Sequence, residues 1–232
     1  MTTTISTQKQ DSVPSDKLFF IDNIKVILTI LVALHHSVIA YSSSEGWYYT
    51  EQTNYLGARI PMTLFLSINQ SFFMGYFFML AAYFTGTSYS RKGTKQFIKD
   101  RLLRLGTPVM FNSFILSPFI SYLVYFFAKG HRIGYFDYLS KYDSWIDLGV
   151  TWFIAALLIF TLTYVGVKKA VNISFKTDMA APDTKVILFF AFALGILSFL
   201  VRILFPVGWV LQPVGFQLGH FPQYIALFII GL

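Results

Sequence analysis

Cysteine is absent from this chain of 232 residues, and charged residues are scarce. Without cysteine the chain has no disulfide bond, no thiol nucleophile and no thiolate metal ligand. Its four histidines lack a zinc-binding spacing such as His-Glu-x-x-His, so the sequence predicts no metal site. Charged residues make up 12% of the chain, whereas soluble domains carry about 25%. This deficit excludes an ordinary soluble domain and indicates a protein of the lipid bilayer.

Apolar side chains are abundant instead, at 55% of the chain, and the mean hydropathy is +0.59. A membrane helix needs about 17–25 mainly apolar residues. Such stretches lie at 19–41, 60–84, 108–127, 148–167 and 185–205, and a sixth begins near Phe221. The predicted fold class is all-α, a polytopic transmembrane helix bundle of about five or six helices.

The two ends of the chain differ in character. Residues 1–18 are polar and predict a disordered cytoplasmic tail, followed by one transmembrane domain over 19–232. The sixth apolar stretch stops at Leu232, where it is too short to cross a bilayer. We therefore expect the chain to be truncated at its C-terminus.

The net charge of +7 predicts an orientation in the membrane, and no nucleic-acid partner, because the basic residues adjoin apolar stretches. If the N-terminus is inside, thirteen lysines and arginines lie on the inner side and four on the outer side. Arg202 lies near an outer end of a span. The positive-inside rule then predicts a cytoplasmic N-terminus.

The first apolar stretch carries one polar stripe. Lys25 and His36 are eleven positions apart, which makes three helical turns plus about 20°, so both leave the same helix face. Asp22 and Thr29 fall within about 60° of that direction. Ionisable residues at membrane depth are costly and indicate function, so we expect the stripe to be buried or to line a wet cavity.

Each charged member of the stripe has two readings. His36 is a candidate general base, since a neutral imidazole can take and return a proton near pH 7, or it is an interfacial histidine bonded to a carbonyl. Lys25 either pairs with Asp22 at the inner interface or holds an anionic group of a substrate. The adjoining His35 points elsewhere, toward headgroups or a neighbouring helix.

Two arginines lie in a basic segment over 91–108. The apolar residues of this segment follow helical spacing, and Arg101 and Arg104 lie about 60° apart. The sequence predicts a basic amphipathic helix at the inner interface, which ends where Pro108 opens the third span. Its arginines either anchor anionic lipid headgroups or bind the phosphates of a nucleotide-bearing donor such as coenzyme A.

Five motifs occur in a fixed order along the chain. They are Ile21-Asp-Asn-Ile-Lys25 with His36, Phe77-Phe-Met-Leu-Ala-Ala-Tyr-Phe84, Phe97 with Arg101-Leu-Leu-Arg104-Leu and Pro108, Trp152-Phe-Ile154, and Phe221-Pro-Gln-Tyr224 with Phe228-Ile-Ile-Gly231. Together they resemble the acyltransferase-3 family of integral-membrane acyltransferases, especially members similar to glucan succinyltransferases and O-acetyltransferases. The resemblance spans nearly the whole chain after residue 20.

The resemblance implies an O-acyltransferase of about ten transmembrane helices in a bacterial inner or cell membrane, of which this chain holds the N-terminal half. Such a protein moves an acetyl- or succinyl-like group from cytosolic acyl-CoA to a hydroxyl of an extracytoplasmic or membrane-associated glycan or similar acceptor. It implies no permanently bound cofactor. By match to the motifs, His36 is the catalytic base, Lys25, Arg101 and Arg104 bind the donor, and Asp22 and Thr29 support them.

The chain also departs from the family pattern. Lys25 stands where the family has arginine, which keeps the charge but loses the bidentate fork. Ala81-Ala82 replaces Ser-Gly in the second motif, and Thr151 precedes the tryptophan where many members have histidine.

Two other functions remain open on the residues alone. A secondary transporter or exporter could use Asp22, Lys25 and His36 as a pathway, although the sequence shows no inverted repeat. The chain could also be an inactive fragment that acts as a scaffold.

Overall fold

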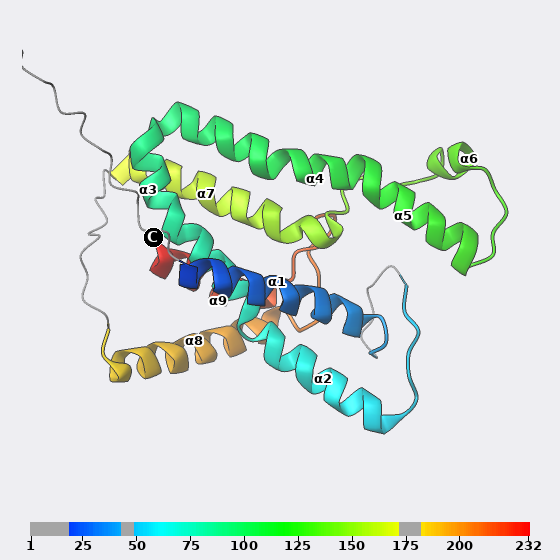
Figure 1. Cartoon of the computed structure of the whole chain (residues 1–232), viewed down its shortest axis with the longest axis horizontal. Coiled ribbons are helices and arrows are strands. Elements are labelled where there is room, and N and C mark those ends of the chain that lie inside the picture. The colour runs from blue at the N-terminus through cyan, green and yellow to red at the C-terminus, as the bar shows by residue number, and fades with distance from the viewer. Residues whose placement is uncertain (1–18, 43–48, 172–181) are drawn as a thin grey trace, which may run out of the picture.

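The computed structural model describes residues 19–42, 49–171 and 182–232, which fold as helices joined by loops (Figure 1). The predicted all-α class is confirmed for these residues. The tail predicted over residues 1–18 lies outside the described residues, and the first helix starts at Phe19. The helices are α1 Phe19–Ile39, α2 Leu56–Gln70, α3 Phe73–Arg101, α4 Thr107–Phe111, α5 Ser117–Leu123, α6 Tyr135–Leu139, α7 Trp152–Val171, α8 Thr184–Leu204 and α9 Phe221–Gly231.

Among the described residues, four helical stretches are long and apolar enough to cross a membrane. They are Phe19–Ile39, Leu56–Ala128, Gly149–Val171 and Thr184–Leu204. Three of them match the spans predicted at 19–41, 148–167 and 185–205. The remaining stretch, Leu56–Ala128, is longer than any predicted span, and the chain changes direction twice within it.

The span predicted at 60–84 is wrong as a single helix. The chain leaves helical geometry at Phe72, with φ −139° and ψ −38°, and so α2 and α3 are separate. Polar side chains compensate the break: the Ser71 hydroxyl donates to Ile68 O at 2.6 Å, and the Gln223 amide donates to Ser71 O. Backbone polar groups freed inside a bilayer need such partners.

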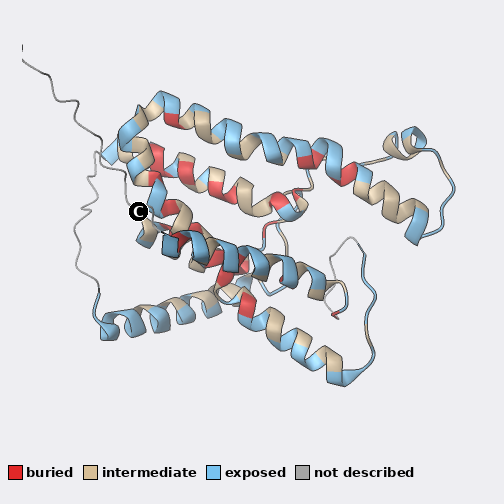
Figure 2. Cartoon of the chain, viewed as in Figure 1, coloured by how far each residue is buried: buried red, intermediate tan, exposed pale blue. Residues whose placement is uncertain are grey.

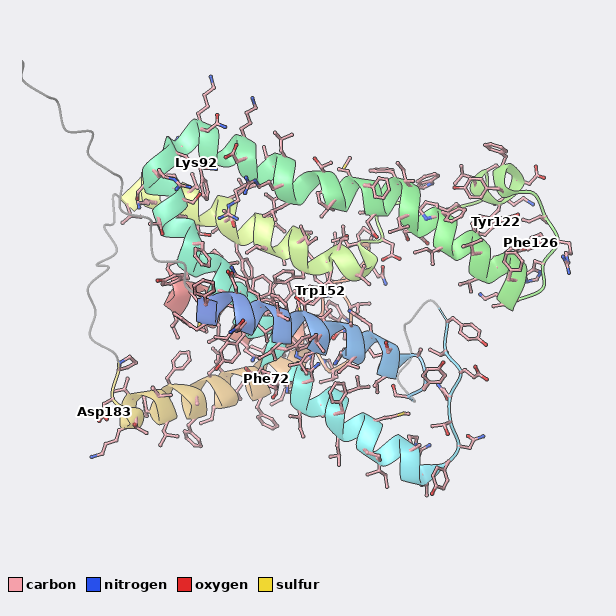
Figure 3. All side chains as sticks on the ribbon, viewed as in Figure 1. Phe72, Lys92, Tyr122, Phe126, Trp152 and Asp183 are labelled. Carbon is pink, nitrogen blue, oxygen red and sulfur yellow. The ribbon has the colours of Figure 1, made fainter. Side chains whose placement is uncertain are left out.

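The second change of direction is at Gly93, whose φ of +71° suits glycine and strains other residues. Figure 3 shows Lys92 at this corner. From Thr94 the chain is helical without interruption to Ala128, so the separate amphipathic helix predicted before Pro108 is wrong. Pro108 is tolerated because the turn before it, Leu102–Gly106, is π-helical and changes which carbonyls need a donor. A second π-helical turn, Asn112–Leu116, precedes Pro118 in the same way, and a third spans Val124–Ala128.

Helix α3 is the centre of the bundle, and α1, α7 and α9 pack against it. The Phe78 ring is fully buried there and contacts Phe153 and Phe160 of α7 and Tyr224 of α9 at 4.7–5.1 Å between ring centroids. Figure 2 shows buried residues gathered on these helices. By contrast, no residue of α8 is buried, which suits a helix that faces lipid.

Candidate active site

Both histidines of α1 line a cavity of about 1010 Å³. Its wall also includes Gln70 at the end of α2, Trp152 at the start of α7 and Tyr224 of α9. The loop before α7 contributes Asp143, Ser144 and Asp147. The polar break between α2 and α3, next to the histidines, therefore opens on a hollow large enough for a small-molecule or sugar substrate.

His35 is the more deeply buried of the two histidines. It is 7% exposed, and its ring lies against Phe73 at 5.0 Å between centroids. The Asn69 side-chain amide, 2% exposed, lies 3.2 Å from His35 Nδ1 and donates to Leu31 O at 3.3 Å. His35 thus meets a neighbouring helix, which was one of the two environments expected for it.

His36 is half-buried beside the cavity, and its ring centroid lies 6.0 Å from that of His35, with the planes at 89°. Consecutive side chains on a helix diverge by about 100°, yet both rings line the same cavity. His36 therefore has the access that a general base needs. Its catalytic role stays a prediction.

A hydrogen bond across the bundle supports the cavity wall. The Gln70 amide donates to the Tyr224 hydroxyl at 3.1 Å, and the Tyr224 ring lies 5.7 Å from the Trp152 ring. Asn69 and Gln70 thus both form hydrogen bonds with other helices, and Gln70 also lines the cavity. The sequence did not show this arrangement, because α2 and α3 were predicted as one helix.

At the other end of α1, Lys25 lies against α3. Its ammonium is 4.6 Å from the centroid of the Phe84 ring and 3.5 Å from Asp22 Oδ1. The predicted pair of Lys25 with Asp22 is therefore present, with both side chains about half exposed. Asp22 and Thr29 are exposed on this chain, and the Thr29 hydroxyl donates to Lys25 O at 2.8 Å. These two residues of the stripe are therefore not buried, and neither lines the histidine cavity.

Arg101 is the last residue of α3, and its side chain contacts the part of the same helix that Lys25 also contacts. Its guanidinium donates to the hydroxyl of the fully buried Thr85 at 3.1 Å and lies 5.0 Å from the Phe97 ring centroid. Lys25 and Arg101 thus contact consecutive residues, Phe84 and Thr85. Arg104, one turn further on, is exposed and close enough to Arg101 to interact with it electrostatically.

The cationic region and the histidines are separated along two antiparallel helices. On α1, Lys25 and His36 are eleven residues apart, or about 16 Å at 1.5 Å per residue. On α3, Phe84 contacts Lys25 and Phe73 contacts His35, and they are also eleven residues apart. The two helices therefore run alongside one another over the whole distance between the predicted donor-binding cations and the predicted base.

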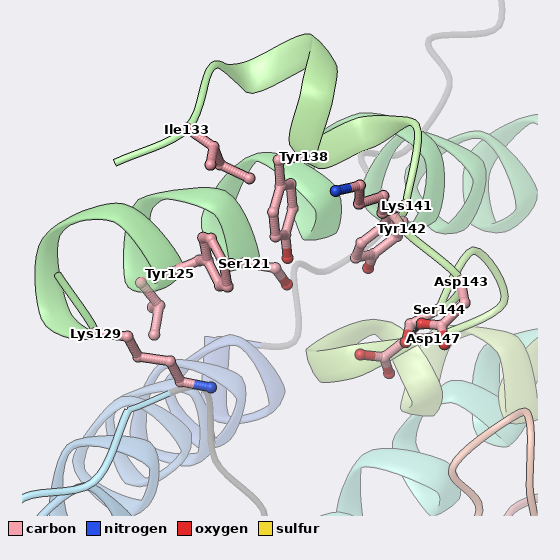
Figure 4. A pocket seen from close by; sticks show the side chains of 11 residues that line it. Ser121, Tyr125, Lys129, Ile133, Tyr138, Lys141, Tyr142, Asp143, Ser144 and Asp147 are labelled. Atoms are coloured by element: carbon pink, nitrogen blue, oxygen red, sulfur yellow. Dashed lines mark hydrogen bonds between the residues drawn. The ribbon is translucent and has the colours of Figure 1, made fainter. Parts of the chain in front are cut away.

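A second cavity, of about 410 Å³, lies between α6 and the C-terminal end of the continuous helical run 94–128 (Figure 4). Figure 4 shows Lys129 at one end of it and Asp143, Ser144 and Asp147 at the other. These three residues line both cavities. The histidine cavity therefore adjoins this second cavity, which is rich in tyrosine and is formed by α6 and the end of the helical run 94–128.

His220, which precedes α9, is buried at 5% exposure. Arg202 Nη2 lies 3.0 Å from its Nδ1, and the His220 ring stacks on Tyr224. The sequence predicted only that Arg202 lies near an outer end of its span. Arg202 therefore contacts His220, which stacks on the cavity residue Tyr224, and Arg202 itself does not line the cavity.

The comparisons with known proteins agree on one family. The model of the acyltransferase-3 family, described as an acyltransferase domain, matches residues 18–232. Glucans biosynthesis protein C of Escherichia coli K12 is 27% identical over 165 residues, which are 69% of this chain and 41% of that protein. The proteins of the same name from strains SMS-3-5 and 536 show the same identity and coverage.

The chain therefore spans 41% of the length of these curated relatives. No solved structure matches it. The family match runs from the start of α1 to the end of α9 and includes both histidines of the cavity and the cations that contact α3. The chain belongs to the acyltransferase-3 family of membrane acyltransferases.

Proposed function

We propose that this protein transfers an acyl group from a cytosolic acyl-CoA donor to a hydroxyl of an extracytoplasmic or membrane-associated glycan. The acyl group is acetyl- or succinyl-like. The observation that carries the proposal is the separation of two regions along α1 and α3. Lys25 and Arg101 contact Phe84 and Thr85 at one end, and His36 lines the large cavity at the other.

The donor side follows from charge. A CoA donor carries phosphates, which arginine binds bidentately and lysine binds as a point charge. With the N-terminus cytoplasmic, as the distribution of basic residues predicts, Lys25, Arg101 and Arg104 face the cytosolic donor. A thioester on an extended arm then reaches toward His36 over a distance of about 16 Å.

The acceptor side follows from the cavity. Trp152 and Tyr224 offer aromatic faces, and Gln70, Asp143 and Asp147 offer polar atoms, a combination suited to a sugar. The relatives named for glucan biosynthesis favour a glucan or a similar glycan as the acceptor. The adjoining second cavity gives a longer acceptor room beyond the reacting hydroxyl.

The reaction is an acyl transfer in which His36 moves the proton. Its neutral imidazole takes the proton of the acceptor hydroxyl as the oxygen attacks the thioester carbon. The carbon–oxygen bond forms, the carbon–sulfur bond then breaks, and the imidazolium returns the proton to the departing thiolate. The products are the acylated acceptor and free coenzyme A.

The test is transfer by the purified protein in lipid vesicles, with radiolabelled acetyl-CoA or succinyl-CoA and a glucan acceptor. We expect His36→Ala to abolish labelling of the glucan. Ser37→Ala is the matched control, because Ser37 is the exposed neighbour and, among the residues that the structure describes, its hydroxyl donates to Ala33 O within α1 at 2.9 Å and to no other helix. Full transfer by His36→Ala, or counter-ion-dependent uptake of solute without transfer, would contradict the proposal.

A further inference from the structure

A buried hydrogen bond fixes which nitrogen of His35 carries the proton. Asn69 Nδ2 has two hydrogens and two acceptors within reach, Leu31 O at 3.3 Å and His35 Nδ1 at 3.2 Å. If the Asn69 amide were flipped, its oxygen would face the carbonyl oxygen of Leu31, and two acceptors cannot form a hydrogen bond with each other. His35 Nδ1 is therefore the acceptor of this pair, and the proton of the neutral ring resides on Nε2.

The His35 ring is held firmly in this state. Phe73 covers it at 5.0 Å, and His35 and Asn69 are 7% and 2% exposed. Burial of this kind disfavours a charged ring. With Nδ1 occupied by Asn69, the polar group that His35 has left for a substrate in the cavity is a neutral N–H donor.

We propose that His35 is a second catalytic residue, whose Nε2–H donates a hydrogen bond to the oxyanion formed during acyl transfer, and that Asn69 is its positioning residue. The inference rests on the proposed function, in which His36 is the base. The two histidines then divide the work, since one moves the proton and the other stabilises the negative charge.

The bonding changes are those of the acyl transfer. When the acceptor oxygen attacks, the π electrons of the thioester carbonyl move onto its oxygen, and the resulting negative charge faces the Nε2–H of His35. When the carbonyl re-forms, the carbon–sulfur bond breaks and the hydrogen bond weakens. His35 keeps its proton throughout, so its ring must stay neutral and donate, which is the state that Asn69 imposes.

The spacing of the two rings fits one reacting carbon between them. Base and oxyanion donor each act over about 3 Å from atoms attached to that carbon. The ring centroids are 6.0 Å apart, and the perpendicular planes direct the two rings differently. A donor aimed at the oxyanion is worth about 10²–10³-fold in kcat in other acyl-transfer enzymes.

The kinetic test compares three His35 and Asn69 variants with the parent protein in the vesicle assay. We expect His35→Phe, which keeps a flat ring without the donor, to lower kcat by about 10²-fold and to leave KM for acyl-CoA nearly unchanged. His35→Gln, which can offer an amide N–H, should recover part of that loss. Asn69→Ala should lower kcat less than His35→Phe, because water can replace its contact to Nδ1.

A spectroscopic test reads the tautomer itself. In protein labelled with ¹⁵N-histidine, we expect the His35 signals, assigned by comparison with His35→Phe, to show a protonated Nε2 and an unprotonated Nδ1. In Asn69→Ala the two tautomers should mix. A merely structural contact between the two side chains would give no such exchange of signals.

The outcomes separate this inference from the proposed function. His35→Phe with full kcat, while His36→Ala is inactive, overturns the role of His35 alone. A proton found on Nδ1 of the parent protein also overturns it, whatever the activity. A parent protein with no transfer activity overturns the proposed function and the catalytic role of His35 together.

Discussion

Lys25 is the single residue at which the proposed donor site differs most from the family pattern. Its ammonium lies 4.6 Å from the Phe84 ring centroid, a position in which an arginine could also stack. We expect Lys25→Arg to keep transfer and to lower KM for acyl-CoA, because a guanidinium can bind phosphate through two hydrogen bonds. Lys25→Met should raise that KM about tenfold, and kcat should change little in either variant. A KM indifferent to both changes would remove Lys25 from the donor site.

A substitution at Thr85 tests the role of Arg101 in donor binding while the charge of the arginine is kept. The Thr85 hydroxyl accepts from Arg101 at 3.1 Å and donates to Ala81 O at 2.8 Å, so Thr85→Val frees the guanidinium and keeps the side-chain volume. We expect KM for acyl-CoA to rise several-fold, with the rise largest at low salt, where phosphate contacts are strongest.

Thr161→Val is the matched control for this prediction. Thr161 is equally buried, and its hydroxyl bonds only to Leu157 O, at 2.7 Å, within α7. Both variants lose a similar hydrogen bond to the helix backbone, so a loss of stability alone would affect them equally. Equal KM values in the two proteins would show that the contact between Arg101 and Thr85 has no part in donor binding.

At the scale of helices, the sequence predicted those that are mainly apolar over their whole length. The spans of α1, α7 and α8 were found because each has about twenty mainly apolar residues between more polar segments. The break after Gln70 was missed because the polar residues Asn69–Ser71 lie inside an otherwise apolar stretch, and the corner at Gly93 was missed because the sequence alone does not show its positive φ. The break after Gln70 also depends on a partner distant in sequence, because the Gln223 amide donates to Ser71 O.

The corner at Gly93 gives a prediction of opposite sign for two similar glycines. Gly93 has φ +71° and open space around it, so Gly93→Ala should lower the free energy of unfolding by about 1–2 kcal/mol through backbone strain alone. Gly106, with φ −69° inside a helix and no atom near its Cβ position, should gain stability by up to about 1 kcal/mol on Gly106→Ala. Thermal unfolding in detergent measures both changes. A melting temperature that shifts in the same direction in both variants would contradict the positive φ of Gly93.

The same missed break explains why the site was only half visible in the sequence. His36, Lys25 and Arg101 were identified from spacing and family motifs, which follow the order of residues along the chain. The contact of Asn69 with His35 joins two helices, and it requires α2 to end beside the C-terminal part of α1. A helical period has no information about where two helices cross, so this part of the site needed the structure.

For the molecule as a whole, the site depends on how closely α9 approaches α3. Tyr224 of α9 forms one wall of the cavity, and its position is set where Gly231, at the end of the same helix, lies against Ala82 and the Met79 carbonyl of α3. Small residues allow membrane helices to approach in this way. Ala82, where the family has glycine, therefore meets a glycine on the facing helix.

This packing predicts a global effect from one methyl group. A Cβ at Gly231 would lie 2.9 Å from Ala82 Cβ and would collide with Met79 O, which belongs to the backbone and cannot rotate away. Gly231→Ala should push α9 from α3 and lower the free energy of unfolding by about 1–3 kcal/mol. Because Tyr224 moves with α9, transfer to the glucan should fall as well. Gly195→Ala on the exposed helix α8, where a Cβ meets no described atom within 4 Å, is the control: it should leave transfer unchanged and should not lower the free energy of unfolding. If both variants unfold alike, close packing of α3 on α9 does not determine the shape of the cavity.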